Sequence, residues 1–279
     1  MCLRSRLLLT LGGIVLWLLS HVTIVVHAAY RDSTTGSGTS GTPSVAVPTG
    51  VLADDICILA AGADQETANF EAGDWPMDFV ELSEVDLTLD GHSAAIGYKR
   101  LTGSDSGSYT FGTIGTAPDW VAQAWCFSGR HTTDAPTLTT ATSNAGNTSP
   151  VSVNASTITA TGCADLLMVS APDVDGDGIA TGHAAPTNYT EREDSENGWA
   201  NLAGFSRDNV TAGATGTVTA TLSLASGASG WVAWLVNIPA ASCGGAAAAP
   251  RCLLVGVCPL RCAGRSNAGC SSRRSVVAP

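Results

Sequence analysis

The sequence predicts an all-β protein, a jelly-roll-like β-sandwich built from two pseudo-repeated halves. Two eight-residue runs, starting at Trp120 and Trp231, are apolar on both faces, which is typical of strands in the middle of a packed sheet. Asp55 leads an apolar strand 65 positions before Trp120. Asp165 leads another, 66 positions before Trp231. This near-equal spacing indicates one unit repeated once, and we expect the two tryptophan-led strands to lie side by side inside one double-layered body.

The N-terminal segment, residues 1–28, has three interpretations. Two arginines precede an apolar run from Leu7 to Leu19, and Val26-His27-Ala28 offers small residues for cleavage, so the segment has the pattern of a signal peptide. The apolar stretch continues through Val26, which allows an uncleaved N-terminal anchor. The β-branched residues from Val22 to Tyr30 also suit a first strand, and the residues before them would then be an upstream extension.

We expect the β-sandwich domain to span residues 29–241. In its first half, strands are predicted at 44–47, 55–60, 81–89, 94–101, 108–111 and 120–127, because short apolar or alternating runs there are separated by turn residues. Asp32–Pro43 is rich in Gly, Ser and Thr and is predicted to be a flexible loop. Ala61–Phe79 is predicted to be a long acidic loop.

The second half repeats this plan. Strands are predicted at 151–153, 165–170, 188–192, 199–207, 215–224 and 231–238. Thr137–Thr148 is predicted to be a polar loop and Pro172–Pro186 a long one. A jelly roll suits this repetition because paired sheets leave few exposed edges. Residues 242–279 hold five cysteines and five arginines without periodicity, which predicts a disordered tail.

Charge is distributed unevenly along the chain. The formal net charge is −11 at pH 7. All 24 acidic residues lie between Arg31 and Asp208 with only 6 basic residues, so this body carries −18. Such an acidic body repels phosphate backbones, and we therefore expect no nucleic-acid partner.

Several short motifs together resemble a known family. Val45-Ala46-Val47-Pro48-Thr49-Gly50-Val51 leads into Asp55-Ile56-Cys57-Ile58, and Ala185–Arg192 is followed in the second half by Thr211–Thr219. This order of turns and strands resembles the β-sandwich domains of bacteriophage minor tail and tail-fibre proteins, over about Val45 to Ala241. The resemblance implies a role at the virion surface or in host binding rather than catalysis. The N-terminal segment and the Cys/Arg tail depart from that pattern.

One local motif suggests calcium. Asp173, Asp175 and Asp177 alternate ahead of Gly178, as at the start of a calcium loop whose oxygen ligands converge around a tight turn. The twelfth position is Ala184 instead of the usual glutamate, so another carboxylate would have to complete the site. The alternative is an acidic turn between strands. No cofactor is required, and structural calcium remains an option.

No catalytic constellation is recognisable. The five histidines are scattered, and neither a Gly-x-Ser-x-Gly elbow nor a phosphate-binding glycine loop occurs. Glu84 and Asp86 share a strand face, as paired carboxylates of glycosidases do, but a solvated strand edge explains them better. We therefore expect a protein that is not an enzyme and has no catalytic residues.

The cysteines and aromatic residues leave alternatives open. Cys57 and Cys126 lie in predicted core strands and are expected to be buried free thiols, with a disulfide as the alternative if the protein is exported. Trp75, Tyr189 and Trp199 are candidate ligand-binding aromatics if they are exposed, and Trp75 is the one most expected to be. Burial in the core is the alternative for all three.

These observations predict a non-enzymatic virion or surface structural protein, associated with a phage tail, that contacts the host surface, a host glycan or other subunits. We expect a homo-oligomer, with membrane contact only through an uncleaved N-terminal segment. The alternative is a secreted carbohydrate-binding or adhesion module, stabilised by calcium. Either would be located on a virion or outside the cell, and a mature protein that begins near Ala29 would favour the second.

Overall fold

In the computed structural model, every regular element of the described residues is a β-strand. The structure describes residues 29–64, 70, 73–87, 91–116, 118–129, 133–143, 149–174, 180–224 and 228–241. In this part of the chain no helix is long and apolar enough to cross a membrane. The all-β prediction is thus confirmed, whereas the interpretations of residues 1–28 and 242–279 concern segments outside the described residues.

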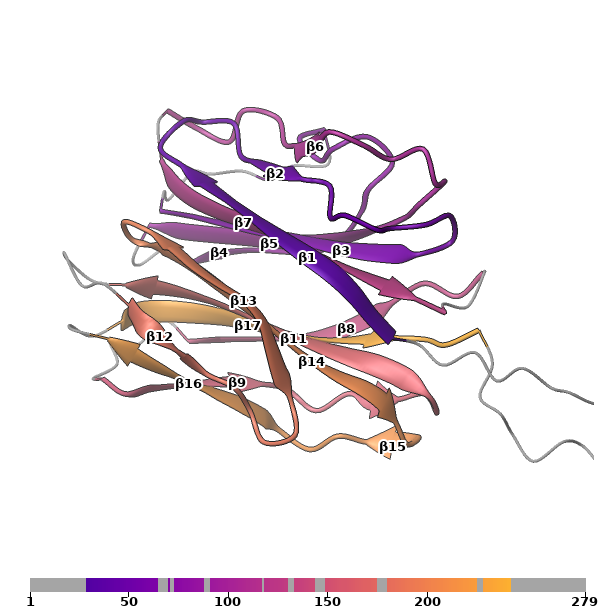
Figure 1. Ribbon diagram of the computed structural model, residues 1–279. Helices are drawn as coiled ribbons and strands as arrows, with labels where there is room; N and C mark the ends of the chain where they lie inside the picture. Colours follow the sequence, from indigo (N-terminus) through magenta and orange to yellow (C-terminus); the bar gives the residue numbers. More distant parts are fainter. Residues whose placement is uncertain are drawn as a thin grey trace, which may run out of the picture. The chain divides into compact units, whose positions relative to one another are not determined.

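The first half of the chain forms a large antiparallel sheet and a small one. Its strands are β1 (Ala29–Gly38), β2 (Ser44–Ala46), β3 (Ile56–Asp64), β4 (Val80–Leu87), β5 (His92–Arg100), β6 (Ser108–Thr110) and β7 (Asp119–Ser128). The large sheet has the order β1-β7-β3-β5-β4, and β2 pairs with β6 outside it (Figure 1).

The second half has the same two parts. Its strands are β8 (Thr137–Ser143), β9 (Val151–Ala155), β10 (Thr159–Ala160), β11 (Ala164–Val174), β12 (Ala180–Ala184), β13 (Thr190–Asn197), β14 (Ala200–Val210), β15 (Gly213–Ala214), β16 (Val218–Leu224) and β17 (Ala228–Ile238). The large sheet has the order β13-β14-β11-β17-β8, beside a three-stranded sheet β12-β16-β9 and the short pair β10-β15.

The strand order confirms the internal repeat. Taken from its other edge, the second large sheet is β8-β17-β11-β14-β13, which corresponds strand for strand to β1-β7-β3-β5-β4. In the small sheets, β9-β16 corresponds to β2-β6. Strands far apart in sequence therefore pair in the same pattern twice.

The two large sheets face each other across a central core (Figure 1). Trp125 of β7 and Trp234 of β17 are both fully buried in this core, which contains residues of both halves. Each large sheet has a second core on its outer face, under its own small sheet. The two large sheets therefore form the expected β-sandwich, and the small sheets add one outer layer on each side. The tryptophan-led strands are interior, as predicted, but they lie in different sheets instead of side by side.

Two polar segments predicted to be loops are edge strands. Asp32–Gly38 belongs to β1 and Thr137–Ser143 to β8, and each pairs with the tryptophan-led strand of its sheet. Backbone pairing holds these strands even though few of their side chains are apolar. Glycine has a specific role here, because a Cβ on Gly38 would lie 2.8 Å from the ring of Trp120. The predicted loop Pro172–Pro186 likewise contains β12.

The aspartates that revealed the repeat are not equivalent positions. Ile56 and Ile58 of β3 face the central core, whereas in β11 it is Leu167 and Val169 that do so. Even-numbered residues point inward in the first strand and odd-numbered residues in the second, so Asp55 and Asp165 differ by one residue in register. The strands β3 and β11 correspond, but the sequence spacing pairs positions that are one residue apart in register.

Candidate functional site

The same tight turn precedes β4 and β13. In the first half it is Pro76-Met77-Asp78-Phe79, where Asp78 has φ 68° and the Phe79 N–H donates to the Pro76 carbonyl at 3.1 Å. In the second half Asn188 has φ 67° and the Tyr189 N–H donates to the Pro186 carbonyl at 3.0 Å. Asp and Asn are the non-glycine residues that best tolerate this left-handed conformation. The turns are therefore structural equivalents.

A second pair of equivalent loops lies beside these turns. Gly107 has φ 80° directly before β6, and Gly216 has φ 71° two positions before β16. Both glycines separate hydroxyl residues, in Ser106-Gly107-Ser108 and in Thr215-Gly216-Thr217. Alignment on these glycines places Ala214 where the first half has Asp105.

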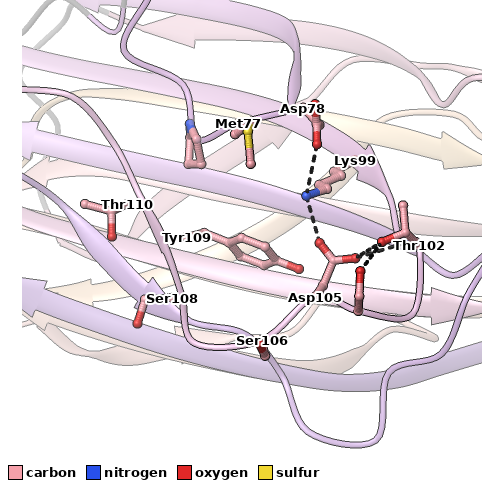
Figure 2. A pocket seen from close by; sticks show the side chains of 11 residues that line it. Met77, Asp78, Lys99, Thr102, Asp105, Ser106, Ser108, Tyr109 and Thr110 are labelled. Carbon is pink, nitrogen blue, oxygen red and sulfur yellow. Dashed lines mark hydrogen bonds and ion pairs between the residues drawn. The ribbon is translucent and has the colours of Figure 1, made fainter.

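Each turn and its neighbouring loop enclose an open pocket of about 370 Å³. The first pocket is lined by Met77, Asp78, Lys99, Asp105 and Tyr109, together with serine and threonine hydroxyls (Figure 2). The lining of the second pocket includes Thr187, Asn188, Tyr189, Arg207, Thr215 and Thr217. The duplication has thus produced two equivalent surface pockets, which we name the first and the second pocket.

In the first pocket the cation is neutralised within the protein. The Lys99 ammonium lies 2.7 Å from one carboxylate oxygen of Asp105 and 3.7 Å from Asp78 (Figure 2). The N–H of Thr102 donates to Asp105 at 3.0 Å. Burial raises the pKa of Asp105, but the hydrogen bonds from Lys99 and Thr102 outweigh it and hold this pKa below its usual value. Asp105 is therefore a fixed anion in contact with Lys99.

In the second pocket the cation is Arg207, and no described carboxylate lines the pocket beside it. Among the described residues that line it, Arg207 is the only charged one. Burial raises the pKa of Tyr189 to about 12, although Arg207 acts in the opposite direction, so the phenol is neutral at pH 7. Its oxygen is buried and has no hydrogen-bond partner in the described part of the chain. The second pocket thus offers a guanidinium and several threonine hydroxyls to a ligand, and Tyr189 forms part of its wall.

The structure also contains a Ser–His–Asp chain that sequence reasoning missed. His183 Nε2 lies 3.2 Å from the Ser170 hydroxyl, and its Nδ1 lies 3.0 Å from Asp194 Oδ1. The His183 N–H also donates to Asp194 Oδ2 at 2.8 Å. No sequence motif predicts this arrangement, because the three residues come from three different strands, β11, β12 and β13.

The connectivity is that of a nucleophile, a base and an orienting carboxylate, but its location differs from that of an active site. Ser170 has no exposed surface, and the His183 ring lies 6.0 Å from the ring of Phe205 in the outer core. A substrate cannot contact the hydroxyl in this conformation. What the contacts do accomplish is to hold β12 against β11 and β13.

The three candidate aromatic residues do not form one platform. Trp75 is half-buried, with its ring 5.2 Å from that of Phe111, and a Cβ on Gly97 would lie 2.7 Å from it. The expected exposure of Trp75 is therefore wrong, because its ring packs over a glycine of β5. Tyr189 lines the second pocket, and Trp199 is 38% exposed at the turn between β13 and β14. Of the three, Tyr189 is the one that lines either of the two pockets described above.

Only part of the calcium motif lies among the described residues. Asp173 is buried near the end of β11, in register with Ala200 of β14 and Gly230 of β17. It is therefore part of a strand ladder, whereas the motif placed it at the start of a loop. Asp175 and Asp177 lie outside the described residues. Within the described part, no cluster of three or more His, Cys, Asp or Glu side chains could hold a metal ion.

The carboxylates weighed for glycosidase chemistry have structural partners. Glu84 and Asp86 lie on β4, which is an edge strand. Glu84 accepts a hydrogen bond from the Phe70 N–H at 2.8 Å, and Asp86 accepts one from the Ser93 hydroxyl at 2.6 Å. These contacts tie β4 to its neighbours.

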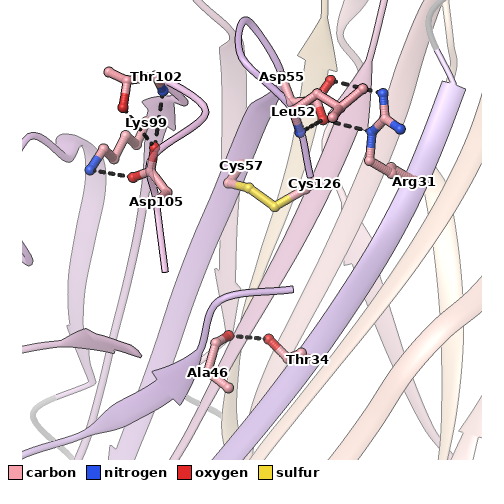
Figure 3. Close-up of a disulfide and its surroundings, with 10 residues drawn as sticks. All are labelled: Arg31, Thr34, Ala46, Leu52, Asp55, Cys57, Lys99, Thr102, Asp105 and Cys126. Carbon is pink, nitrogen blue, oxygen red and sulfur yellow. Dashed lines mark hydrogen bonds and ion pairs between the residues drawn. A yellow bond between two sulfur atoms is a disulfide. The ribbon is translucent and has the colours of Figure 1, made fainter. Parts of the chain in front are cut away.

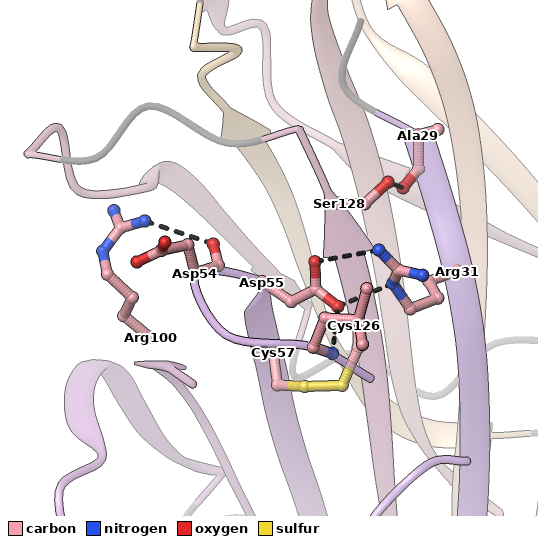
Figure 4. A network of polar contacts seen from close by, with 9 residues as sticks. Ala29, Arg31, Asp54, Asp55, Cys57, Arg100, Cys126 and Ser128 are labelled. Atoms are coloured by element: carbon pink, nitrogen blue, oxygen red, sulfur yellow. Dashed lines mark hydrogen bonds and ion pairs between the residues drawn. A yellow bond between two sulfur atoms is a disulfide. The ribbon is translucent and has the colours of Figure 1, made fainter. Parts of the chain in front are cut away.

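Cys57 and Cys126 form a disulfide, so the expectation of free thiols is wrong (Figure 3). The two residues are register partners on the adjacent strands β3 and β7. Nearby, Arg31 of β1 forms an ion pair of 2.6 Å with the buried Asp55, which also accepts the Leu52 N–H (Figure 4). Cys163 is also disulfide-bonded.

Comparison with known proteins adds no identification. No family model matches the chain, and no curated protein or solved structure is significantly similar to it. A function must therefore be inferred from the pockets and the chemistry of the residues that line them.

Proposed function

We propose that this chain is a non-enzymatic structural protein of a virion or cell surface, probing the host surface by binding glycans through its two pockets. The observation that carries the proposal is the repetition of one open, hydroxyl-lined pocket in both halves. Few convergent polar groups on a rigid scaffold are the usual means of orienting a small ligand.

The lining of the first pocket favours a sugar over an apolar ligand. Hydroxyl groups come from Thr102, Ser104, Ser106, Ser108 and Thr110. Each hydroxyl can both donate and accept a hydrogen bond, which matches the hydroxyls of a saccharide. Met77, which is 81% exposed at the rim, adds an apolar surface for a sugar ring.

The two pockets are separate sites. The first pocket involves β6 and the second β16, and these strands belong to opposite outer layers of the body (Figure 1). One short glycan therefore cannot fill both pockets. Each pocket can hold a glycan of its own, or one can hold a glycan and the other a group of a neighbouring subunit.

A glycan array with the full chain tests the proposal. We expect binding to at least one class of saccharide, weakened about tenfold by the double change Ser106→Ala and Ser108→Ala, which removes two hydroxyls from the first pocket. The exposed Ser152→Ala, on β9 and outside both pockets, is the matched control and should bind like the parent. A folded protein that binds no saccharide and does not assemble with itself or with virion subunits would overturn the proposal.

The second candidate is a secreted carbohydrate-binding or adhesion module, and the disulfide favours it. A buried Cys57–Cys126 bridge is stable where the environment is oxidising, as it is outside the cell. Mass spectrometry of the native protein separates the two candidates. A mature chain that begins near Ala29 with the bridge formed supports secretion, whereas an intact Met1 and reduced cysteines would contradict it.

A further inference from the structure

We infer that the second pocket binds a carboxylate-bearing sugar. The first pocket accepts only neutral sugars, because its cation, Lys99, already forms an ion pair with Asp105. This inference rests on the proposed glycan-binding function and specifies the class of ligand that each of the two pockets binds. It follows from a comparison of equivalent positions in the two halves.

Both pockets keep one cation on an equivalent strand. Lys99 lies near the end of β5 and Arg207 near the end of β14, and these strands correspond in the two sheet orders. Both side chains line their pockets. Duplication has therefore retained a positive charge at this place, although the residue type differs.

The carboxylates of the first pocket are absent from the second. Asp105 contacts Lys99 at 2.7 Å, and its equivalent is the uncharged Ala214. Asp78 lies 3.7 Å from Lys99, and its equivalent in the turn is Asn188, with the same backbone conformation. In the first half a side chain of the protein thus holds the position that a ligand carboxylate would take in the second.

The chemistry of arginine fits this assignment. A guanidinium presents parallel N–H donors that match the two oxygens of a carboxylate, whereas an ammonium is a point charge. Thr187, Thr215 and Thr217 surround the site with hydroxyls for the remainder of the sugar. The body as a whole is acidic and repels anions at a distance, so recognition must come from Arg207 itself.

Titration calorimetry with matched ligands tests the inference. The ligands are an oligosaccharide ending in a uronic acid, its carboxyl-reduced neutral form, and inorganic phosphate. For the full-length parent we expect the acidic sugar to bind at least about tenfold more tightly than the neutral form, at low ionic strength. Phosphate binding as tight as that of the acidic sugar would overturn the carboxylate assignment in favour of a general anion site.

Two variants of the second pocket are expected to lose this preference. Arg207→Gln removes the cation, and Asn188→Asp restores the carboxylate of the first pocket without changing side-chain size, since Asp78 shows that aspartate tolerates this turn. Each should reduce affinity for the acidic sugar about tenfold and leave the neutral form unaffected. Arg100→Gln, which removes a positive charge outside both pockets, should change neither affinity.

The reciprocal change should create a second acidic-sugar site. Asp105→Asn together with Asp78→Asn removes both carboxylates from Lys99 in the first pocket and keeps side chains of similar shape, so the binding stoichiometry for the acidic sugar should rise from one to two. Circular dichroism and thermal melting establish that each variant is folded. If neutral sugars bind but the acidic preference does not depend on Arg207, the inference is wrong and the proposed function stands. If no sugar binds, both fail.

Discussion

At the scale of single residues, His92 combines burial with a lack of partners. It lies at the start of β5 with no exposed surface, and its two ring nitrogens have no hydrogen-bond partner in the described part of the chain. A Cβ on Gly62 would lie 3.3 Å from the ring, so the glycine leaves room for it. Burial lowers the pKa of His92 to about 4, and the side chain is therefore neutral at pH 7.

This burial predicts that stability falls in mild acid. The unfolded chain takes up a proton near the ordinary histidine pKa of about 6.5, whereas the folded protein does so only near 4. The contribution is complete above pH 6.5 and is lost as the pH falls towards 4, by about 3 kcal/mol in total. Urea unfolding of the parent and of His92→Leu over this range measures it.

The comparison with His92→Leu is needed because a neighbouring group acts in the opposite direction. Asp64 is the register partner of His92, and burial, assisted by Asp119, raises its pKa. That shift favours the folded state at low pH. The difference between parent and variant isolates the histidine, and parallel pH profiles would contradict the prediction.

At the scale of elements, the disulfide joins two central strands of the first large sheet. Cys57 of β3 and Cys126 of β7 are 69 residues apart in sequence, and both are fully buried in the outer core of that half. The second half has no cysteine in its equivalent strands β11 and β17. The second half nevertheless contains a disulfide-bonded cysteine of its own, Cys163, directly before β11.

Removal of this link should destabilise the protein through the unfolded state. A bridge that closes a loop of this length contributes about 4 kcal/mol in the chain-entropy description. We expect Cys57→Ala with Cys126→Ala to lower the free energy of unfolding by about 2–5 kcal/mol, measured by guanidinium denaturation. Reducing agent should affect the parent in the same direction. An unchanged denaturation midpoint in the double variant would show that the bridge contributes nothing.

At the scale of the whole molecule, one contact in the central core shows how closely the halves pack. Gly204 of β14, in the second large sheet, lies under the ring of Trp125 of β7, in the first, and a Cβ at this glycine would collide with the indole. Gln123 of β7 adds a hydrogen bond of 2.8 Å from its amide to the Leu202 carbonyl. The central core thus depends on a tryptophan from one half fitting a gap in the other.

Gly204→Ala should therefore separate the two large sheets or displace the indole. We expect a loss of about 1–3 kcal/mol in the free energy of unfolding, since a well-packed core tolerates added volume poorly. In a Trp125→Leu background the same change should cost much less, and the four proteins form a double-mutant cycle. Additive losses would mean that the two residues do not share this contact. Gly73→Ala, where a Cβ meets nothing within 4 Å, is the control.

Three features are predictable from the amino-acid sequence: the strand content, the interior position of the tryptophan-led strands and the repeat. These features follow from local alternation of apolar residues and from spacing along the chain, which a single sequence contains. The edge strands β1 and β8 could not be predicted, because their side chains show no apolar alternation. Backbone pairing with a neighbouring strand holds them in place. The half-burial of Trp75 was not predictable for a related reason. The glycine beneath its ring, Gly97, belongs to a strand that follows later in the sequence.

Three other features depend on the three-dimensional fold: how the halves stack, that Cys57 pairs with Cys126, and where the pockets lie. The stacking depends on which face of each large sheet meets the other, and this contact joins residues that are far apart in the sequence. The pockets combine a turn, a strand end and a loop that are separated along the chain. The residues that line them form no recognisable sequence motif. Folding places Lys99 beside Asp105 in the first pocket and leaves Arg207 without a carboxylate among the described residues that line the second.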